Sequence, residues 1–198
     1  MPNGGPGDQT TAGGLLPAEV ETELRRRWAE PHRHYHSTTH LVSGLAALDL
    51  LGAGDPERIA FWFHDAVHSN RTPADEEASA ALAGELLAGY LEPAAVREVQ
   101  RLVMLTSHHQ PGTDDVAGAR LCDADLSALG ADPGQHKVNV AGIRAELPGL
   151  TDEQWRLGRG AFLERFLRRD RLFHTPTGRR LWESRARENL RQELASLR

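Results

Sequence analysis

The stretch Phe61-Trp62-Phe63-His64-Asp65-Ala66-Val67-His68 decides how the rest of the chain must be arranged. It places three polar side chains of metal-binding type directly after an aromatic run. Burying polar groups there costs free energy, because a core side chain would stabilise the protein more. A divalent cation held by these side chains is the simplest compensation. We therefore expect an aromatic helix that carries His64, Asp65 and His68 on its last turns.

Signals for helices recur along the rest of the chain. A proline or a capping residue followed by apolar residues at helical spacing is typical of a helix start. Such starts are expected at Pro17, Asp55-Pro56, Thr72-Pro73, Pro93, Asp132-Pro133, Thr151 and Thr175-Pro176, with helical runs over 78–91, 155–170 and 179–197 and a loop over 111–118. No segment alternates apolar and polar residues as a half-buried strand does. The sequence therefore predicts an all-α fold.

The composition favours a single folded unit. With 198 residues and 39% hydrophobic content, the chain can bury one substantial core but is short for two domains. Residues 1–14 are rich in glycine and proline and have no hydrophobic pattern, so we expect a disordered tail there. The sequence predicts one domain over residues 15–198.

Charge and cysteine content exclude several classes of function. The net charge is -5 and the basic residues are mixed with acidic ones, so no basic face favours a nucleic-acid polymer, although a small phosphate ester still fits. Cys122 is the only cysteine, which excludes an intramolecular disulfide and favours a reducing compartment. Neither a membrane-spanning run nor the pattern of a signal peptide is present. We expect a soluble, cytoplasmic protein with no membrane partner.

Two further histidines precede the apolar run over residues 41–48. His36 and His40 are four residues apart, so they share a helical face and point into one cavity if the helix begins before Ser37. If the helix begins at Ser37 or Thr38, His36 lies at the mouth of that cavity instead. The sequence alone leaves both arrangements open.

Residues that commonly bind metals gather near the expected helix ends. They are His36, His40, His64, Asp65, His68, His108, His109, Asp123 and Asp125. A lone histidine on an apolar helix is more often a hydrogen-bonded core residue. We interpret four histidines in this way: His34, His109, His136 and His174. Either Asp123 or Asp125 can instead cap a helix start, so which of the two binds an ion is open.

The spacing of these residues resembles the H…HD…D signature of the HD superfamily of metal-dependent phosphohydrolases. His64-Asp65 follows an isolated upstream histidine and precedes Ala124-Asp125-Leu126. The segment Tyr35-His36-Ser37-Thr38-Thr39-His40 is similar to the Tyr-His-x-x-x-His of cyclic-nucleotide phosphodiesterases. Asp125-Leu126-Ser127-Ala128-Leu129 likewise resembles the segment with their last metal-binding aspartate. A closer likeness, from Arg33 to the final helix, is to small bacterial proteins classed as predicted HD phosphohydrolases, whose substrate is generally unassigned.

The resemblance implies a single HD-type helical bundle and a role for each matching residue. Four residues would hold the ion: His40, His64, Asp65 and Asp125. Asp65 or Asp125 would accept a proton from the attacking water, and His36 would protonate the leaving group. The cofactor is then a divalent metal, with manganese, magnesium, iron, nickel and zinc all open. The reaction is hydrolysis of a phosphate ester or anhydride of a small molecule such as a nucleotide.

Four more residues are candidates for contacts with the substrate. They are Arg33, His68, His108 and Lys137. In the phosphodiesterases a histidine that matches His68 lies just outside the metal ligands, whereas the small bacterial group has a tyrosine there. His68 can orient water, contact phosphate or help to hold a second ion, and His108 matches an extra ligand of two-metal members. A second ion therefore stays open, and Arg33 and Lys137 can equally be surface cations.

Two other functions fit the same residues. The scaffold can hold two irons and activate oxygen, with His68 and His108 as the extra ligands. It can also be a non-catalytic nucleotide sensor, although a protein that only binds needs no proton donor at His36. Whether the protein forms a homodimer is open as well.

Overall fold

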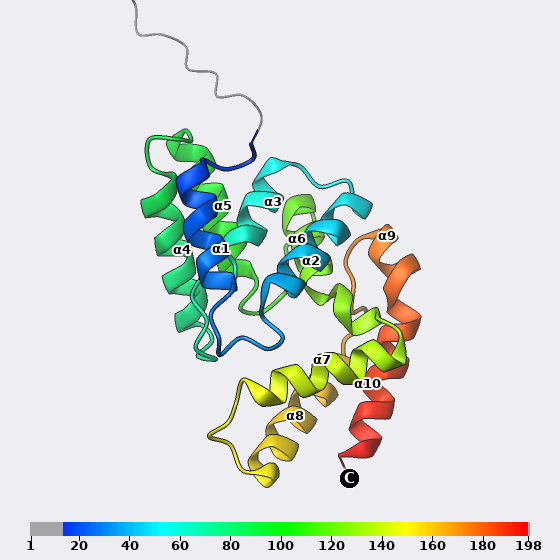
Figure 1. Ribbon diagram of the computed structural model, residues 1–198. Helices are drawn as coiled ribbons and strands as arrows, with labels where there is room; N and C mark the ends of the chain where they lie inside the picture. The colour runs from blue at the N-terminus through cyan, green and yellow to red at the C-terminus, as the bar shows by residue number, and fades with distance from the viewer. Residues whose placement is uncertain (1–13, 198) are drawn as a thin grey trace, which may run out of the picture.

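The computed structural model describes residues 14–197 and consists of helices joined by short loops (Figure 1), so all of the expected tail except Gly14 lies outside it. The principal helices are α1 (Ala18–Trp28), α2 (Thr38–Leu50), α3 (Asp55–Phe63), α4 (Ala74–Leu87), α5 (Pro93–Leu105), α6 (Val116–Leu126), α7 (Pro133–Ala145), α8 (Asp152–Leu167) and α10 (Ser184–Ser196). A 3-10 turn, η1 (Ser127–Gly130), follows α6, and the short α9 (Pro176–Gly178) and the π-helix η2 (Arg179–Glu183) lead into α10. Residues 14–197 contain no strand, only an isolated bridge between Ala88 and Leu91. The predicted all-α fold is confirmed.

Several helices begin where capping chemistry predicts. The Asp132 carboxylate accepts the backbone N–H groups of Gly134 and Gln135 at the start of α7. Thr151 and Gln154 form a capping box at the start of α8, in which each side chain accepts the backbone N–H of the other residue. Both predicted starts are confirmed.

Two helix boundaries differ from the prediction. α4 stops at Leu87, short of the predicted end, and Gly89 beyond it adopts a left-handed backbone with a φ of 83°. α6 begins inside the loop predicted over 111–118, because Asp115 accepts the backbone N–H of Gly118 and so caps a helix start.

The most consequential difference concerns the aromatic helix. α3 ends at Phe63, and the prediction that it carries the polar side chains of residues 64–68 on its last turns is wrong. The Nδ1 atom of His64 lies 2.8 Å from the carbonyl oxygen of Phe61. The imidazole of His64 thus contacts a carbonyl near the end of the helix, where side chains compete with backbone N–H groups. The metal-binding candidates are displayed by a tight turn that follows the helix.

Two clusters of buried side chains hold the helices together. The larger cluster joins α1 to α6 around Trp28, Phe61 and Phe63, all of which are fully buried. A Cβ atom at Gly44 would overlap the ring of Phe61, so this glycine lets α2 approach α3 closely. The smaller cluster joins α8 and α10 around Phe166. In Figure 1, α7, α8 and α10 lie below the helices of the larger cluster.

A cleft of about 740 Å³ has walls from both parts of the molecule. The segment before α2, the turn after α3 and the turn after α5 contribute one set of lining residues, and α7, α8 and the turn after α8 contribute another. Trp182 on η2 packs against both hydrophobic clusters. The cleft is therefore formed where the two parts meet.

The helices differ from membrane-spanning helices in length and polarity. None within residues 14–197 has both the length and the apolar run that crossing a membrane requires. The longest, α8, has 16 residues and begins with two acidic side chains. The expected single domain over residues 15–198 and the expected location in the cytoplasm stay predictions.

Candidate active site

Four side chains predicted as metal ligands converge at one wall of the cleft. We call them the primary cluster: His40 on α2, His64 and Asp65 after α3, and Asp125 near the end of α6. His40 Nε2 lies 3.0 Å from Asp125 Oδ1 and 3.2 Å from His64 Nε2. His64 Nε2 lies 3.1 Å from Asp65 Oδ2. Ligand bonds of roughly 2.1 Å place neighbouring ligand atoms roughly 3 Å apart. One ligand-type atom from each of His40, His64 and Asp65 lies within 4.8 Å of the others, which is close enough for one cation. Asp125 adjoins this group through its contacts with the two imidazoles.

The core beneath the primary cluster fixes its imidazoles. His40 and His64 are only 6% and 2% exposed. Because the carbonyl of Phe61 engages Nδ1 of His64, Nε2 is the nitrogen that faces the other ligands. The Trp28 ring packs against His64 with 5.4 Å between ring centroids, and its indole N–H donates to the Trp62 carbonyl. The orientation of His64 is therefore set by the fold itself.

The charges of the primary cluster favour a cation. Burial alone would lower the pKa of His64, but the carboxylates of Asp65 and Asp125 outweigh burial and raise that pKa well above its ordinary value. Burial by itself would raise the pKa values of Asp65 and Asp125, yet the neighbouring His64 keeps both below their ordinary values. Burial lowers the pKa of His40. The two carboxylates thus favour a positive charge at His64, and a divalent ion can supply that charge in place of a proton.

The structure distinguishes between the two aspartates of α6. Asp123 is fully buried and accepts the backbone N–H groups of His174 and Thr175 at 2.6 and 2.8 Å. It also accepts the Thr175 hydroxyl at 2.7 Å, so it anchors the segment that leads into α9. Asp125 is the aspartate that belongs to the primary cluster.

His36 lies at the mouth of the cavity, because α2 begins at Thr38. This is the second of the two arrangements that the sequence left open. The Nδ1 atom of His36 lies 2.6 Å from Oε2 of Glu146. Oε1 of Glu146 accepts the backbone N–H groups of His34, Tyr35 and His36 at 2.7, 2.7 and 2.8 Å. One buried carboxylate therefore fixes both the backbone and the ring of His36.

Glu146 is the main site residue that sequence reasoning missed. It follows α7 directly and is 7% exposed. Burial alone would raise its pKa, but the hydrogen bond with His36 and the neighbouring His68 hold that pKa well below the ordinary value. Burial would lower the pKa of His36, yet the carboxylates of Asp65 and Glu146 outweigh it and raise that pKa. His36 is thus more readily protonated than an ordinary histidine.

A second group of ligand-type atoms lies beside the first. We call His36, His68 and Glu146 the secondary cluster, since one such atom from each lies within 4.8 Å of the others. The side chain of His68 is 7% exposed, and its Nε2 atom lies 3.4 Å from Oε2 of Glu146 without a hydrogen bond to any residue of 14–197. The His36 ring is 4.3 Å from the His68 ring and 5.8 Å from the His40 ring, centroid to centroid. His36 therefore borders both clusters.

The two histidines after α5 lie at different depths of the cleft. Nε2 of His109, expected as a hydrogen-bonded core residue, lies 2.6 Å from Oδ2 of Asp125, so His109 touches the primary cluster. His108, expected as an extra ligand or a phosphate contact, is exposed at the cleft and accepts the backbone N–H of Gln110 through Nδ1. His109 has a left-handed backbone with a φ of 53°, which turns its ring toward α6.

Two residues expected to contact phosphate are engaged elsewhere. The buried Arg33 donates to the carbonyl oxygens of His36 and Asp65 at 3.2 and 2.7 Å and pairs with Glu30. It therefore joins the segment before α2 to the turn after α3 and does not face the cleft. Lys137 is exposed on α7 and lines a different cavity. Lys137 is therefore a surface cation, which the sequence left open, whereas the buried Arg33 is neither a surface cation nor a lining residue of the cleft.

Three arginines that the sequence did not single out line the cleft: Arg159 and Arg165 on α8 and Arg169 in the following turn. Arg159 pairs with Glu193 at 2.6 Å. The guanidinium of Arg169 lies 4.1 Å from the centroid of the Phe166 ring and donates to the carbonyl oxygen of His108 at 3.0 Å. Burial and the charge of Arg165 lower the pKa of Arg169. Within residues 14–197 neither Arg165 nor Arg169 forms an ion pair, so both can receive an anionic ligand.

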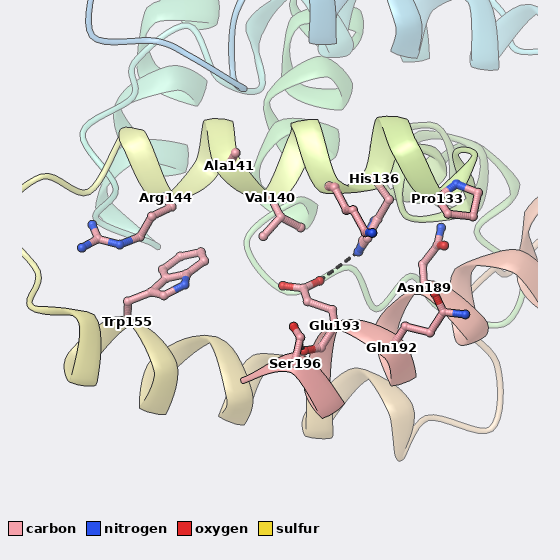
Figure 2. Close-up of a pocket in the computed structure, with 11 residues that line it drawn as sticks. Pro133, His136, Val140, Ala141, Arg144, Trp155, Asn189, Gln192, Glu193 and Ser196 are labelled. Atoms are coloured by element: carbon pink, nitrogen blue, oxygen red, sulfur yellow. Dashed lines mark hydrogen bonds and ion pairs between the residues drawn. The ribbon is translucent and has the colours of Figure 1, made fainter. Parts of the chain in front are cut away.

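A separate cavity of about 470 Å³ lies between α7, α8 and α10 (Figure 2). Nε2 of His136 on α7 lies 2.9 Å from Oε2 of Glu193 on α10, so His136 is a hydrogen-bonded core residue as predicted. Arg159 binds the same carboxylate through two N–H groups at 2.6 and 3.1 Å. Arg159 also lines the cleft described above. The buried network therefore holds the Arg159 guanidinium between the two cavities.

Comparison with protein-family models, with curated proteins and with solved structures finds no match to this chain. The chemistry of the site is therefore inferred from the geometry of its own residues. The likeness of the motifs to the HD superfamily stays a prediction.

Proposed function

We propose that this chain is a metal-dependent phosphohydrolase that acts on a small phosphorylated molecule. The observation that carries the proposal is the convergence of four ligand side chains from α2, the turn after α3 and α6. Two imidazoles with two carboxylates suit manganese, magnesium, iron, nickel or zinc. When bound, such an ion lowers the pKa of a water molecule toward roughly 7 and offsets charge on phosphoryl oxygens.

Asp65 is the best-placed group to take up the proton of the attacking water. Asp125 already contacts His40 and His109 at 3.0 and 2.6 Å. In the described part of the chain, the Asp65 carboxylate pairs closely only with His64, at 3.1 Å, and its side chain is 18% exposed against 14% for Asp125. An oxygen of Asp65 therefore stays open toward the cleft.

His36 is placed to protonate the leaving oxygen. Glu146 engages its Nδ1 atom, which leaves Nε2 as the nitrogen available to the cleft. The raised pKa of His36 increases the protonated fraction near neutral pH, where a general acid must hold its proton. A protein that only binds nucleotides needs no oriented acid, so the pairing of His36 with Glu146 favours catalysis over sensing.

The cleft suits an anionic substrate of nucleotide size. Its volume of about 740 Å³ lies within the range of roughly 300–1,000 Å³ typical of small-ligand pockets. Arg165 and Arg169 supply guanidinium groups for phosphate oxygens, and Phe162 supplies an aromatic face in the same wall. The segment over residues 35–40 resembles the Tyr-His-x-x-x-His motif of cyclic-nucleotide phosphodiesterases, and this resemblance supports a nucleotide as the substrate.

A screen of phosphate monoesters, nucleotides and cyclic nucleotides with Mn²⁺, read as loss of substrate by chromatography, tests the proposal. His64→Ala should abolish both bound metal and turnover while the helical circular dichroism is retained. The matched control is His34→Ala, which changes an exposed histidine near the site and should keep both. Wild-type turnover in His64→Ala would contradict the proposal, and oxygen consumption by the iron-loaded protein would favour a di-iron oxygenase.

A further inference from the structure

The secondary cluster has the composition of a cation site that the proposed reaction does not use. Its three residues come from separate segments: His36 before α2, His68 after α3 and Glu146 after α7. One ligand-type atom from each lies within 4.8 Å of the others. Two imidazoles and one carboxylate are a common set of three protein ligands, with the remaining positions left to water.

His68 supplies an independent sign that a ligand belongs there. Its side chain is 7% exposed, and Nε2 has no hydrogen-bond partner among residues 14–197. Buried polar atoms are rarely left without a partner, because the loss of hydration is then uncompensated. The ring of His32 is parallel to that of His68, with 5° between the planes and 6.4 Å between the centroids. The unpartnered nitrogen faces Oε2 of Glu146 at 3.4 Å.

Glu146 supplies the negative charge in a fixed position. Three backbone N–H groups hold Oε1, so the carboxylate cannot turn away from the histidines. Among residues 14–197, Oε2 has a hydrogen bond only with Nδ1 of His36, at 2.6 Å. A cation at this place must displace that hydrogen bond, whereas the ligands of the primary cluster already have the spacing of a cation site. Binding at the secondary cluster should therefore be the weaker of the two.

We propose that the secondary cluster is a second, weaker site for a divalent cation, and that an ion there inhibits the enzyme. The inhibitory part rests on the proposed function, because it concerns the role of His36 as the acid. A neutral imidazole that binds a cation through Nδ1 keeps its Nε2 proton at neutral pH and cannot donate it. The same histidine therefore serves either as proton donor or as ligand.

Titration of the metal-free protein with Mn²⁺, followed by the electron paramagnetic resonance of the free ion, tests the site. The wild type should show two classes of sites with affinities that differ by about tenfold or more. His68→Gln should lose the weaker class and keep the tighter one, whereas His40→Ala should do the reverse. His32→Gln, which changes the stacked neighbour outside the cluster, should keep both.

One class of sites in the wild type, or a weaker class that persists in folded His68→Gln, would overturn the second site. If His68→Gln does not fold, His36→Gln is read in the same way. Mn²⁺ that fills the weaker class should lower wild-type turnover about tenfold but leave His68→Gln uninhibited, and equal inhibition of both would overturn the inhibitory role. If His68→Gln loses the weaker class but the wild type has no phosphohydrolase activity, the second site is supported and only the proposed function is contradicted.

Discussion

The primary and secondary clusters use the same chemical groups in one cleft, yet they are organised differently. In the primary cluster, Nδ1 of His64 is engaged by a carbonyl and Nε2 faces the other ligands. In the secondary cluster, one oxygen of Glu146 accepts backbone N–H groups and the other contacts His36, while Nε2 of His68 has no hydrogen-bond partner within residues 14–197. The first arrangement leaves ligand-type atoms facing one another, whereas the carboxylate of the second also holds the segment before α2. Two clusters of similar side chains can therefore differ in their affinity for a cation.

The largest contrast is expected between the two aspartates of α6. Asp125→Asn removes a ligand and should lower metal affinity and turnover by more than about 100-fold, with little loss of stability. Asp123→Asn should keep the bound metal but lower the free energy of unfolding by about 2 kcal/mol, since Asp123 accepts three hydrogen bonds. Metal analysis and urea unfolding of both variants check this pair. Loss of metal from Asp123→Asn but not from Asp125→Asn would mean that Asp123 is the ligand and Asp125 is not.

A smaller effect is expected from replacing Glu146, the carboxylate that orients the proposed proton donor His36. Glu146→Gln should lower kcat by about 10- to 100-fold, because His36 loses its orienting carboxylate. His36 acts when protonated, so activity is lost as the pH rises through its raised pKa. Without the charge of Glu146 that pKa falls, and the basic limb of the kcat profile should move to lower pH. Glu153→Gln, an exposed change on α8, is the control, and an unmoved basic limb would exclude His36 as the acid.

The arginines of the α8 wall should affect substrate binding more than the chemical step. Arg169→Gln should raise KM by about tenfold with a smaller change in kcat, because it removes from the cleft a guanidinium that has no ion pair with any described residue. Arg168→Gln is the matched control, since the Arg168 side chain is 71% exposed and pairs with Glu164. Steady-state kinetics of both variants measure the difference. An equal KM in both would place the phosphate elsewhere.

The smallest effect is expected from His68 in the absence of metal. His68→Leu removes a buried nitrogen that has no hydrogen-bond partner in the described chain, so the unfolding free energy of the metal-free protein should stay the same or rise by about 1 kcal/mol. Thermal unfolding with a chelator present measures it. A loss of more than about 2 kcal/mol would mean that the imidazole stabilises the metal-free fold.

The sequence predicts those parts of the fold and site that depend on local patterns. Capping residues such as Asp132 and Thr151 mark helix starts, because the side chains that accept their orphan N–H groups are encoded nearby. The all-α class follows from such signals together with helical spacing. The resemblance to the H…HD…D signature likewise implies four ligands, His40, His64, Asp65 and Asp125, which the structure brings together.

The rest depends on contacts that no local pattern records. Glu146 meets His36 across 110 residues of sequence, and an acid after an amphipathic helix is common on protein surfaces. His109 reaches Asp125 only because its backbone is left-handed, which the sequence His108-His109 does not specify. Asp123 and Asp125 are two positions apart on α6 and face different sides, so spacing shows that one faces the site but not which one.

Anomalous diffraction from crystals grown with Mn²⁺ tests the central claim most directly. We expect the strongest anomalous peak roughly 2.0–2.3 Å from Nε2 of His40 and His64 and from carboxylate oxygens of Asp65 and Asp125. A well-ordered site with these four side chains and no anomalous density among them would contradict the account.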